Sequence, residues 1–189
     1  MKNHLAAFIL LLFIGSCTKD RDANIQYFKE HTNTIDTTGG ITGTVLINEF
    51  VATGSTVNNE YFSGSDWIEL YNTGDSAINF ATHNYYITDD STNKNKFKID
   101  NLSIPGKGFI VVYCDDSSKI TTQIHTGFKL SSSGEFVGLY KKDASDNFIP
   151  LTEYPFGVQS SGPSVGRYPD GGTNWVTNLV PTPGATNHQ

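Results

Sequence analysis

The stretch "SSGPSVGRYPDGG", residues 160–172, contains a Gly-x-Ser-x-Gly pattern in which Ser164 stands between Gly162 and Gly166. In α/β-hydrolases this pattern places a nucleophilic serine on a tight turn between a hydrophobic strand and a helix. Here the residues before the serine are polar and include a proline, and those after it are broken by a proline and two glycines. Because both flanking elements are missing from the pattern, we predict that Ser164 is a strand residue without a nucleophilic role.

Glu49 and Glu69 could form a second kind of catalytic centre. Each glutamate lies in an early apolar segment, in "INE" and "WIE". Two carboxyl groups ~5–10 Å apart across an open cleft can hydrolyse glycosidic bonds. The same residues can instead accept hydrogen bonds from backbone amides or lie on a solvated sheet face. We favour this structural role and keep a carboxylate-dependent hydrolase as the alternative.

The stretch "DDSTNKNKFKID", which begins at Asp89, has oxygen-bearing side chains at its first, third, fifth, seventh and twelfth positions. An EF-hand loop needs glycine at the sixth position and a helix on each side, whereas the sixth residue is Lys94 and the flanks read as strands. An irregular calcium site of Asp89 and Asp90, joined by Asp115 and Asp116, stays open as a hypothesis and would suit a calcium-dependent hydrolase. The simpler interpretation is that these aspartates keep hairpin tips soluble. We therefore assign no firm metal ligand and expect no cofactor.

The sequence contains no pattern typical of zinc binding, phosphate binding or nucleic-acid binding. No His-Glu-x-x-His, Cys-x-x-Cys or His-x-His spacing occurs, so a zinc centre has no support. The glycines of "PGKG" lack the spacing and the hydroxyl residue of a phosphate-binding loop. The net charge of −6 disfavours a nucleic-acid partner, because phosphate-backbone binding needs a basic surface. We expect a protein that binds no nucleic acid and has no catalytic function.

The first residues predict a lipid anchor. Leu5 to Ile14 form an uninterrupted apolar run after Lys2, which is too short to cross a bilayer but has the length of a signal-peptide core. The run closes with "IGSC", which resembles a bacterial lipobox: small residues admit the peptidase, and the cysteine thiol receives the acyl chains. We predict that residues 1–16 are a removed signal peptide and that Cys17 carries lipid.

The residues after the anchor predict where the protein lies in the cell. Lys19 and Asp20 resemble part of the tag that takes some lipoproteins of Bacteroidetes to the cell surface. We expect attachment to the cell envelope, at the outer membrane and with surface exposure. The polar stretch of residues 17–40 reads as a flexible tether spanning roughly 25–30 Å. Residues 41–189 then form one domain.

The rest of the chain predicts the strands that must position these side chains. Short runs of β-branched and aromatic residues alternate with glycine, asparagine, aspartate and proline clusters, a pattern typical of an all-β sandwich. The runs cover residues 44–52, 66–72, 84–90, 96–99, 108–114, 135–142, 164–169 and 174–177. We expect two stacked antiparallel layers, with Cys114 as a buried apolar residue that has no disulfide partner.

Several aromatic residues fall in or beside the expected loops. Exposed rings at such places could stack on sugar rings or anchor a protein partner. The residues in question are Tyr61, Phe62, Tyr85, Tyr86, Tyr154, Phe156, Tyr168 and Trp175. In a sandwich of this size most of them will be core residues, and burial decides between the two roles.

Taken together, the order and spacing of these segments resemble the lamin tail domain, an immunoglobulin-like β-sandwich of nuclear lamins and many bacterial secreted proteins. The resemblance extends from residue 41 to about residue 187. It rests on "INEFVA" (47–52), "DWIELYN" (66–72), "YYITDD" (85–90), "IPGKGFIVVYCDD" (104–116), "HTGFKLSSSGEFVGLY" (125–140), "SVGRYPDGGTNW" (164–175) and "PTPGATN" (181–187). The family commonly has Gly-Trp where this chain has Asn84 and Tyr85, a difference that concerns core packing.

The resemblance implies structural roles for the motif residues. In the family, the segment around Ser164 is a strand and a turn, and the two early glutamates have no known catalytic role. The implied structural residues are Glu49, Trp67, Glu69, Gly166, Arg167, Tyr168, Pro169, Asp170, Gly171, Trp175, Pro183 and Gly184. The resemblance therefore favours a lipid-anchored, non-catalytic module that binds, or is displayed to, a protein or glycan partner.

Overall fold

The computed structural model describes residues 44–189, which form strands and one short 3₁₀ helix. The predicted signal peptide, the predicted lipidation site Cys17 and the expected tether lie outside the described residues. The elements are β1 (Val45–Val51), β2 (Asp66–Asn72), β3 (Ile78–Asn79), η1 (Phe80–Thr82), β4 (Tyr85–Thr88), β5 (Phe97–Ile99), β6 (Ser103–Ile104), β7 (Phe109–Cys114), β8 (Lys119–Ile120), β9 (Ile124–Thr126), β10 (Glu135–Lys142), β11 (Phe148–Phe156), β12 (Ser164–Arg167) and β13 (Trp175–Leu179). Within residues 44–189, no helix is both long enough and apolar enough to span a bilayer.

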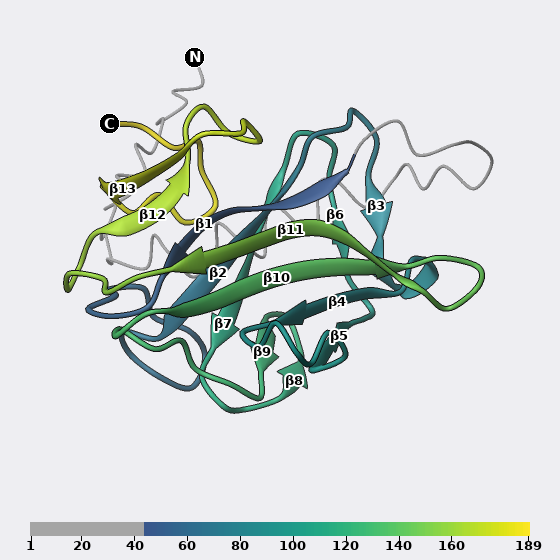
Figure 1. The fold of residues 1–189 in the computed structure, drawn as a ribbon, viewed down its shortest axis with the longest axis horizontal. Coiled ribbons are helices and arrows are strands. Elements are labelled where there is room, and N and C mark those ends of the chain that lie inside the picture. Colours follow the sequence, from purple (N-terminus) through teal and green to yellow (C-terminus); the bar gives the residue numbers. More distant parts are fainter. Residues whose placement is uncertain (1–43) are drawn as a thin grey trace, which may run out of the picture.

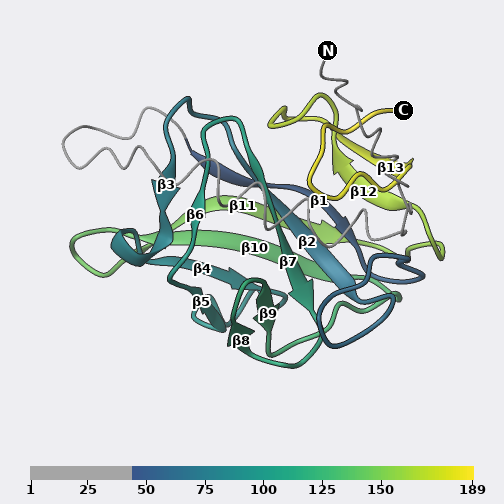
Figure 2. The ribbon, with the colours of Figure 1, turned by 180° about the vertical axis from the view of Figure 1, so that it is seen from behind.

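The strands build a sandwich of two main sheets. A seven-stranded sheet has the order β13-β12-β1-β2-β7-β9-β8, and a four-stranded sheet has the order β11-β10-β4-β5. The four-stranded sheet lies in front of the larger one in Figure 1 and behind it in Figure 2. A third sheet contains only β3 and β6. The all-β sandwich predicted from the sequence is confirmed.

The main core fills the space between the two large sheets. Phe50 of β1 is fully buried there and packs against Phe156 of β11 with ring centroids 4.8 Å apart. It also meets Tyr154 of β11 and Trp175 of β13, each at 6.1 Å. The rings of Tyr154 and Trp175 stack on each other at 4.1 Å. This aromatic group, which we call the Phe50 cluster, joins strands of both sheets.

All eight predicted runs contain strands, but the sequence reading missed others. The missed strands are β3, β6, β8, β9 and β11. The nine residues of β11, which include Pro150 and Pro155, were not among the predicted runs. Proline is tolerated there because β11 is the edge strand of its sheet. The expectation of purely antiparallel layers was wrong at one pair, since β7 and β9 run parallel.

A bulge in β1 decides which side chains face away from the core. Ile47 pairs with Leu70 and Glu49 pairs with Glu69, so Asn48 is the extra residue between them. The core positions consequently shift from Val45 and Ile47 to Phe50 and to Ala52, which directly follows β1. Glu49 and Asn48 are thereby directed to the outer face of the seven-stranded sheet, which is how a bulge re-aims side chains.

Candidate functional site

The outer face of the seven-stranded sheet carries the two glutamates singled out in the sequence. Glu49 and Glu69 are partners on adjacent strands, and both side chains are fully buried. They are covered by the C-terminal segment 181–187, which we call the C-terminal strap. The backbone N–H of Thr182 donates to both carboxylate oxygens of Glu49 at 3.2 and 3.1 Å, and that of Gly184 donates to Glu69 Oε2 at 2.7 Å. Both glutamates thus bind backbone amides, and neither lies on a solvated face.

Ser164 belongs to the same arrangement. It is the first residue of β12 and is 1% exposed. Its hydroxyl donates a short hydrogen bond to Glu49 Oε1 and lies 3.4 Å from the carbonyl oxygen of Leu179. Ser164 thus helps to hold a buried carboxyl group, as its place in a strand predicts, and its hydrogen-bond partners within residues 44–189 include no histidine.

Asn48 connects the glutamates to the turn after β12. Its side-chain Nδ2 donates to Glu69 Oε1 at 3.1 Å and to Asp170 Oδ1 at 3.0 Å. Its Oδ1 accepts the backbone N–H of Gly171 at 3.0 Å. Asn187 of the strap completes the connection, because its backbone N–H also donates to Asp170 Oδ1 at 3.0 Å. We call Glu49, Glu69 and Asp170 the carboxylate cluster.

The nearby cation binds backbone carbonyls instead of the carboxylate cluster. Arg167 Nε donates to the carbonyl oxygen of Ile47 at 2.8 Å, and its Nη1 donates to that of Gly172. The guanidinium also lies over the ring of Trp175, 4.6 Å from its centroid. Arg167 therefore braces β1, the turn and β13, and the carboxyl groups keep only neutral donors.

Burial raises the pKa of both glutamates. The pKa of Glu69 lies well above its usual value because its carboxyl is desolvated, with the Asn48 hydrogen bond opposing the change. The pKa of Glu49 is also raised by burial, against the hydrogen bonds from Ser164 and Thr182. A protonated Glu49 fits the geometry, because the Thr182 hydroxyl lies 3.1 Å from Glu49 Oε2 and 2.8 Å from Asn187 Oδ1. One hydroxyl proton cannot serve both acceptors, whereas a proton on Glu49 would satisfy the first.

The remaining motif residues support this outer face. Trp67 is fully buried in a small cluster with Val51 and Tyr113. The peptide bond between Tyr168 and Pro169 is cis, and it begins the turn that presents Asp170 and Gly171 to Asn48. Gly166 pairs with Glu49 across β12 and β1. Pro183 is exposed between the two strap residues that donate to the glutamates.

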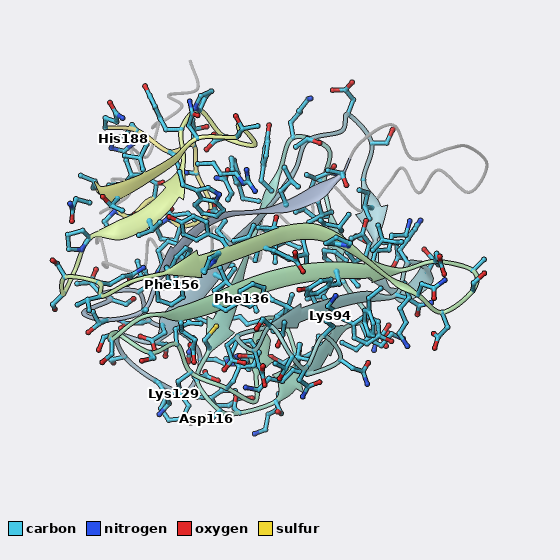
Figure 3. The ribbon with its side chains drawn as sticks, in the orientation of Figure 1. Lys94, Asp116, Lys129, Phe136, Phe156 and His188 are labelled. Carbon is cyan, nitrogen blue, oxygen red and sulfur yellow. The ribbon has the colours of Figure 1, made fainter. Side chains whose placement is uncertain are left out.

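The four aspartates considered for calcium are held by separate partners. Asp89 is buried and forms an ion pair with Lys96. Asp90 accepts the backbone N–H and the hydroxyl of Thr92 at 2.8 and 2.7 Å, which lowers its pKa. Asp116 lies 3.5 Å from Lys129, and Figure 3 shows the two side chains at the same end of the sandwich. In the part of the chain that the structure describes, no three histidine, cysteine or acidic side chains are grouped for a metal ion.

Asp115 lies in a cluster that the sequence did not reveal. It is 5% exposed and faces the fully buried His125, whose Nδ1 is 2.7 Å from Asp115 Oδ2. The other ring nitrogen of His125, Nε2, is 3.2 Å from Glu60 Oε1. We call these three residues the histidine clamp. His125 looked isolated because its partners are 10 and 65 positions away in the sequence.

The loop of residues 52–65 presents two exposed rings beside the clamp. Tyr61 is 44% exposed and Phe62 is 50% exposed, and we call this pair the aromatic tip. Asn59 Oδ1 accepts both of their backbone N–H groups at 2.8 Å. Asn59 Nδ2 donates to Asp115 Oδ2 at 2.9 Å. The tip is therefore fixed to the sheet.

The other aromatic residues considered for binding are less available. Tyr85, Tyr86 and Phe156 are buried. Tyr154 and Trp175 are partly buried in the Phe50 cluster. Tyr168 is 39% exposed and stands alone among them.

Asp66 provides a pH dependence that can be measured. Burial raises its pKa from 3.8 to about 6, although the backbone N–H of Leu130 donates to its carboxyl. A raised pKa means that the folded protein binds this proton more tightly, so the contribution of Asp66 to stability is fully present below pH 3.8 and is lost as the pH rises through about 6. The expected result is that Asp66→Asn flattens the stability curve over this interval, as measured by urea unfolding at several pH values. An unchanged slope would contradict the assignment.

Comparison with known proteins identifies the fold family. A family model described as the Lamin Tail Domain matches residues 41–155, which end within β11. The motifs "SVGRYPDGGTNW" and "PTPGATN", which contribute β12, the turn and the strap, lie beyond the matched range. A comparison with curated proteins found no match, and a comparison with solved structures found none either. The family match covers more than half of the chain, and the chain therefore belongs to the lamin tail domain family.

Proposed function

We propose that this protein is a non-catalytic binding module, held at the cell envelope by lipid on Cys17, which contacts a glycan or protein partner through its aromatic tip. The observation that carries the proposal is the exposure of Tyr61 and Phe62 on a loop that is fixed by hydrogen bonds. Rigid, exposed rings suit binding, because little conformational entropy is lost when a partner stacks on them.

The position of the aromatic tip supports this proposal. β1 begins at Val45, close to residue 40 where the expected tether ends, and it ends at Val51, where the loop of residues 52–65 starts. Seven extended residues span about 20 Å. The loop therefore lies at the opposite end of β1 from Val45, as Figures 1 and 2 both show. A domain anchored through its N-terminus would present the tip away from the membrane.

The surroundings of the tip match those of a sugar-binding surface. Lys119 Nζ lies 4.7 Å from the Tyr61 ring centroid, and the exposed Thr121 hydroxyl donates to Glu60. Aromatic rings contact the apolar faces of sugars, and neighbouring charged and hydroxyl groups can bond to their hydroxyls. A protein partner would use the same rings as buried anchors.

The carboxylate cluster supports the non-catalytic part of the proposal. The alternative function, a two-carboxylate hydrolase, requires Glu49 and Glu69 to face an open cleft. Both are fully buried and accept hydrogen bonds from the protein's own strap. A substrate would have to displace residues 181–187 before it reached either carboxyl group.

The experiment uses cells that express the full chain and makes two measurements: the amount of protein in the membrane fraction, and binding to arrays of immobilised glycans and purified envelope proteins. In the first measurement, Cys17→Ser is expected to release the protein from the membrane fraction. Tyr61→Ser with Phe62→Ser should stay in that fraction and lose at least tenfold in binding. Ile149→Ser with Val158→Ser alters apolar side chains that are 45% and 82% exposed elsewhere and should bind as the wild type does. If the tip variant bound as well as the wild type, the aromatic tip would not be the binding surface. If the wild-type protein bound no glycan and no protein on the arrays, the proposed binding function would be wrong.

A further inference from the structure

The turn between β8 and β9 lies against the aromatic tip. The backbone N–H of Glu60 donates to Gln123 Oε1 at 3.0 Å, and the Thr121 hydroxyl donates to the Glu60 carboxylate. Lys119, the first residue of β8, has its Nζ 4.7 Å from the centroid of the Tyr61 ring. The loop and the turn therefore form one surface. We call this surface the tip platform, and it consists of residues 60–62 and 119–123.

Lys119 gives the tip platform a positive charge that the described part of the protein does not neutralise. Lys119 is exposed and forms no ion pair within residues 44–189. Its ammonium group lies over the Tyr61 ring instead, and a neutral ring attracts a cation without cancelling its charge. Five other lysines each pair with a carboxylate, namely Lys96, Lys98, Lys107, Lys129 and Lys142. An anion that reaches the platform would therefore find a cation that needs a partner.

The carboxyl groups in and beside the tip platform are bound to other residues of the protein. Glu60 Oε1 lies 3.2 Å from His125 Nε2. Asp115 is buried, and Asp116 lies 3.5 Å from Lys129. More distant charges, which give the chain its net charge of −6, are screened over about 8 Å in physiological salt. The overall negative charge therefore does not exclude an acidic ligand from the platform.

Phe62 offers the ring on which a sugar can stack. Its side chain is 50% exposed, and its ring meets that of Tyr61 edge-to-face with centroids 6.3 Å apart. Part of the Tyr61 ring is already used, because it packs against His125 at 4.9 Å and carries Lys119. Phe62 and Lys119 both adjoin Tyr61, so the ammonium group is within reach of a ligand that stacks on Phe62.

We propose that the partner of the tip platform is an acidic glycan, whose sugar ring stacks on Phe62 and whose carboxylate pairs with Lys119. This inference rests on the proposed function, because it names the ligand class that the aromatic tip binds. Stacking alone does not distinguish an acidic sugar from a neutral one of the same shape, since both present the same apolar face. The ion pair does distinguish them, and an exposed ion pair changes affinity by up to about fivefold.

The test applies the purified full chain to an array on which each acidic glycan is printed beside its carboxyl-reduced, neutral form. The acidic probes are oligogalacturonate, hyaluronan oligosaccharides and sialyllactose, and neutral cello-oligosaccharides and purified envelope proteins share the array. We expect the wild type to bind at least one acidic probe about fivefold more tightly than its reduced form.

The other outcomes separate this inference from the proposed function. Equal binding of the acidic and reduced forms would overturn the inference, and so would binding of neutral glycans alone or of proteins alone. In each of these cases the proposed function would stand. If the wild type bound no glycan and no protein, the proposed function would be wrong, and this inference with it.

Lysine variants test whether the charge of Lys119 sets the preference. Lys119→Gln should bind both forms of the preferred probe as the wild type binds the reduced form, and this retained binding shows that the variant is folded. Lys119→Arg keeps the charge and should keep the preference. Lys107→Gln is the matched control, because Lys107 donates to the carbonyl oxygen of Thr73, which bonds to Thr44 beside the start of β1. A preference that persisted in Lys119→Gln would reject the ion pair.

Discussion

Replacing Asn48 with alanine is expected to lower the free energy of unfolding by about 3 kcal/mol. A buried polar group that loses its partner costs about 1–3 kcal/mol, and this change removes a partner from Glu69, from Asp170 and from the Gly171 N–H at once. The three groups lie in or beside the C-terminal strap, so the loss should also appear as faster hydrogen exchange at Gly184. Urea unfolding monitored by tryptophan fluorescence measures the first effect, and mass spectrometry measures the second.

Asn95→Ala is the matched control for this prediction. Asn95 is exposed, and alanine substitutions at such surface sites usually change stability by less than about 0.5 kcal/mol. If Asn48→Ala were no more destabilising than Asn95→Ala, the bulge in β1 would not be holding the carboxylate cluster to the strap. The comparison therefore tests the arrangement of the outer face and not the general sensitivity of the domain.

Replacing Phe50 with alanine should be at least as damaging, with an expected loss of about 3–5 kcal/mol. Phe50 is fully buried, and its ring packs against the rings of Tyr154, Phe156 and Trp175. Its removal leaves a cavity where the two sheets meet, and the stacked pair of Tyr154 and Trp175 cannot fill it without separating. Thermal and urea unfolding both measure the loss.

Phe62→Ala provides the control with the same chemical change. Phe62 is 50% exposed and has one aromatic neighbour, Tyr61, at 6.3 Å. We expect it to leave the unfolding free energy within about 0.5 kcal/mol of the wild type. Equal losses at the two phenylalanines would contradict the placement of Phe50 in the core.

Local sequence patterns predicted the strands because short runs of β-branched and aromatic residues lie between clusters of turn residues. In β7, the run "GFIVVYC" is apolar at every position after its glycine, so it predicts a strand, whereas only the fold shows that Ile110 and Val112 enter the main core. β9 escaped notice because it has only three residues and pairs in parallel with β7. Its position depends on the path of the whole connection between Cys114 and Ile124, which no local pattern records.

The hydrogen bonds on the outer face of the seven-stranded sheet join residues that are far apart in the sequence, so local patterns could not predict them. The sequence suggested that Glu49 could accept backbone amides, but its main donor, Thr182, is 133 positions away. The bulge that directs Glu49 outward is visible only once the register of β1 and β2 is known. Likewise, His125 gives no local signal of Glu60 or Asp115. Spacing in the chain predicts which residues share a strand, whereas the fold decides which carboxyl groups meet.

The two prolines of β11 have a consequence for molecules held close together. β11 is the long free edge of the four-stranded sheet, where a strand from a neighbouring molecule could add itself through backbone hydrogen bonds. Pro150 and Pro155 have no N–H to offer such a strand. Crowded copies of this domain would therefore remain separate molecules along this edge, without growing into fibrils.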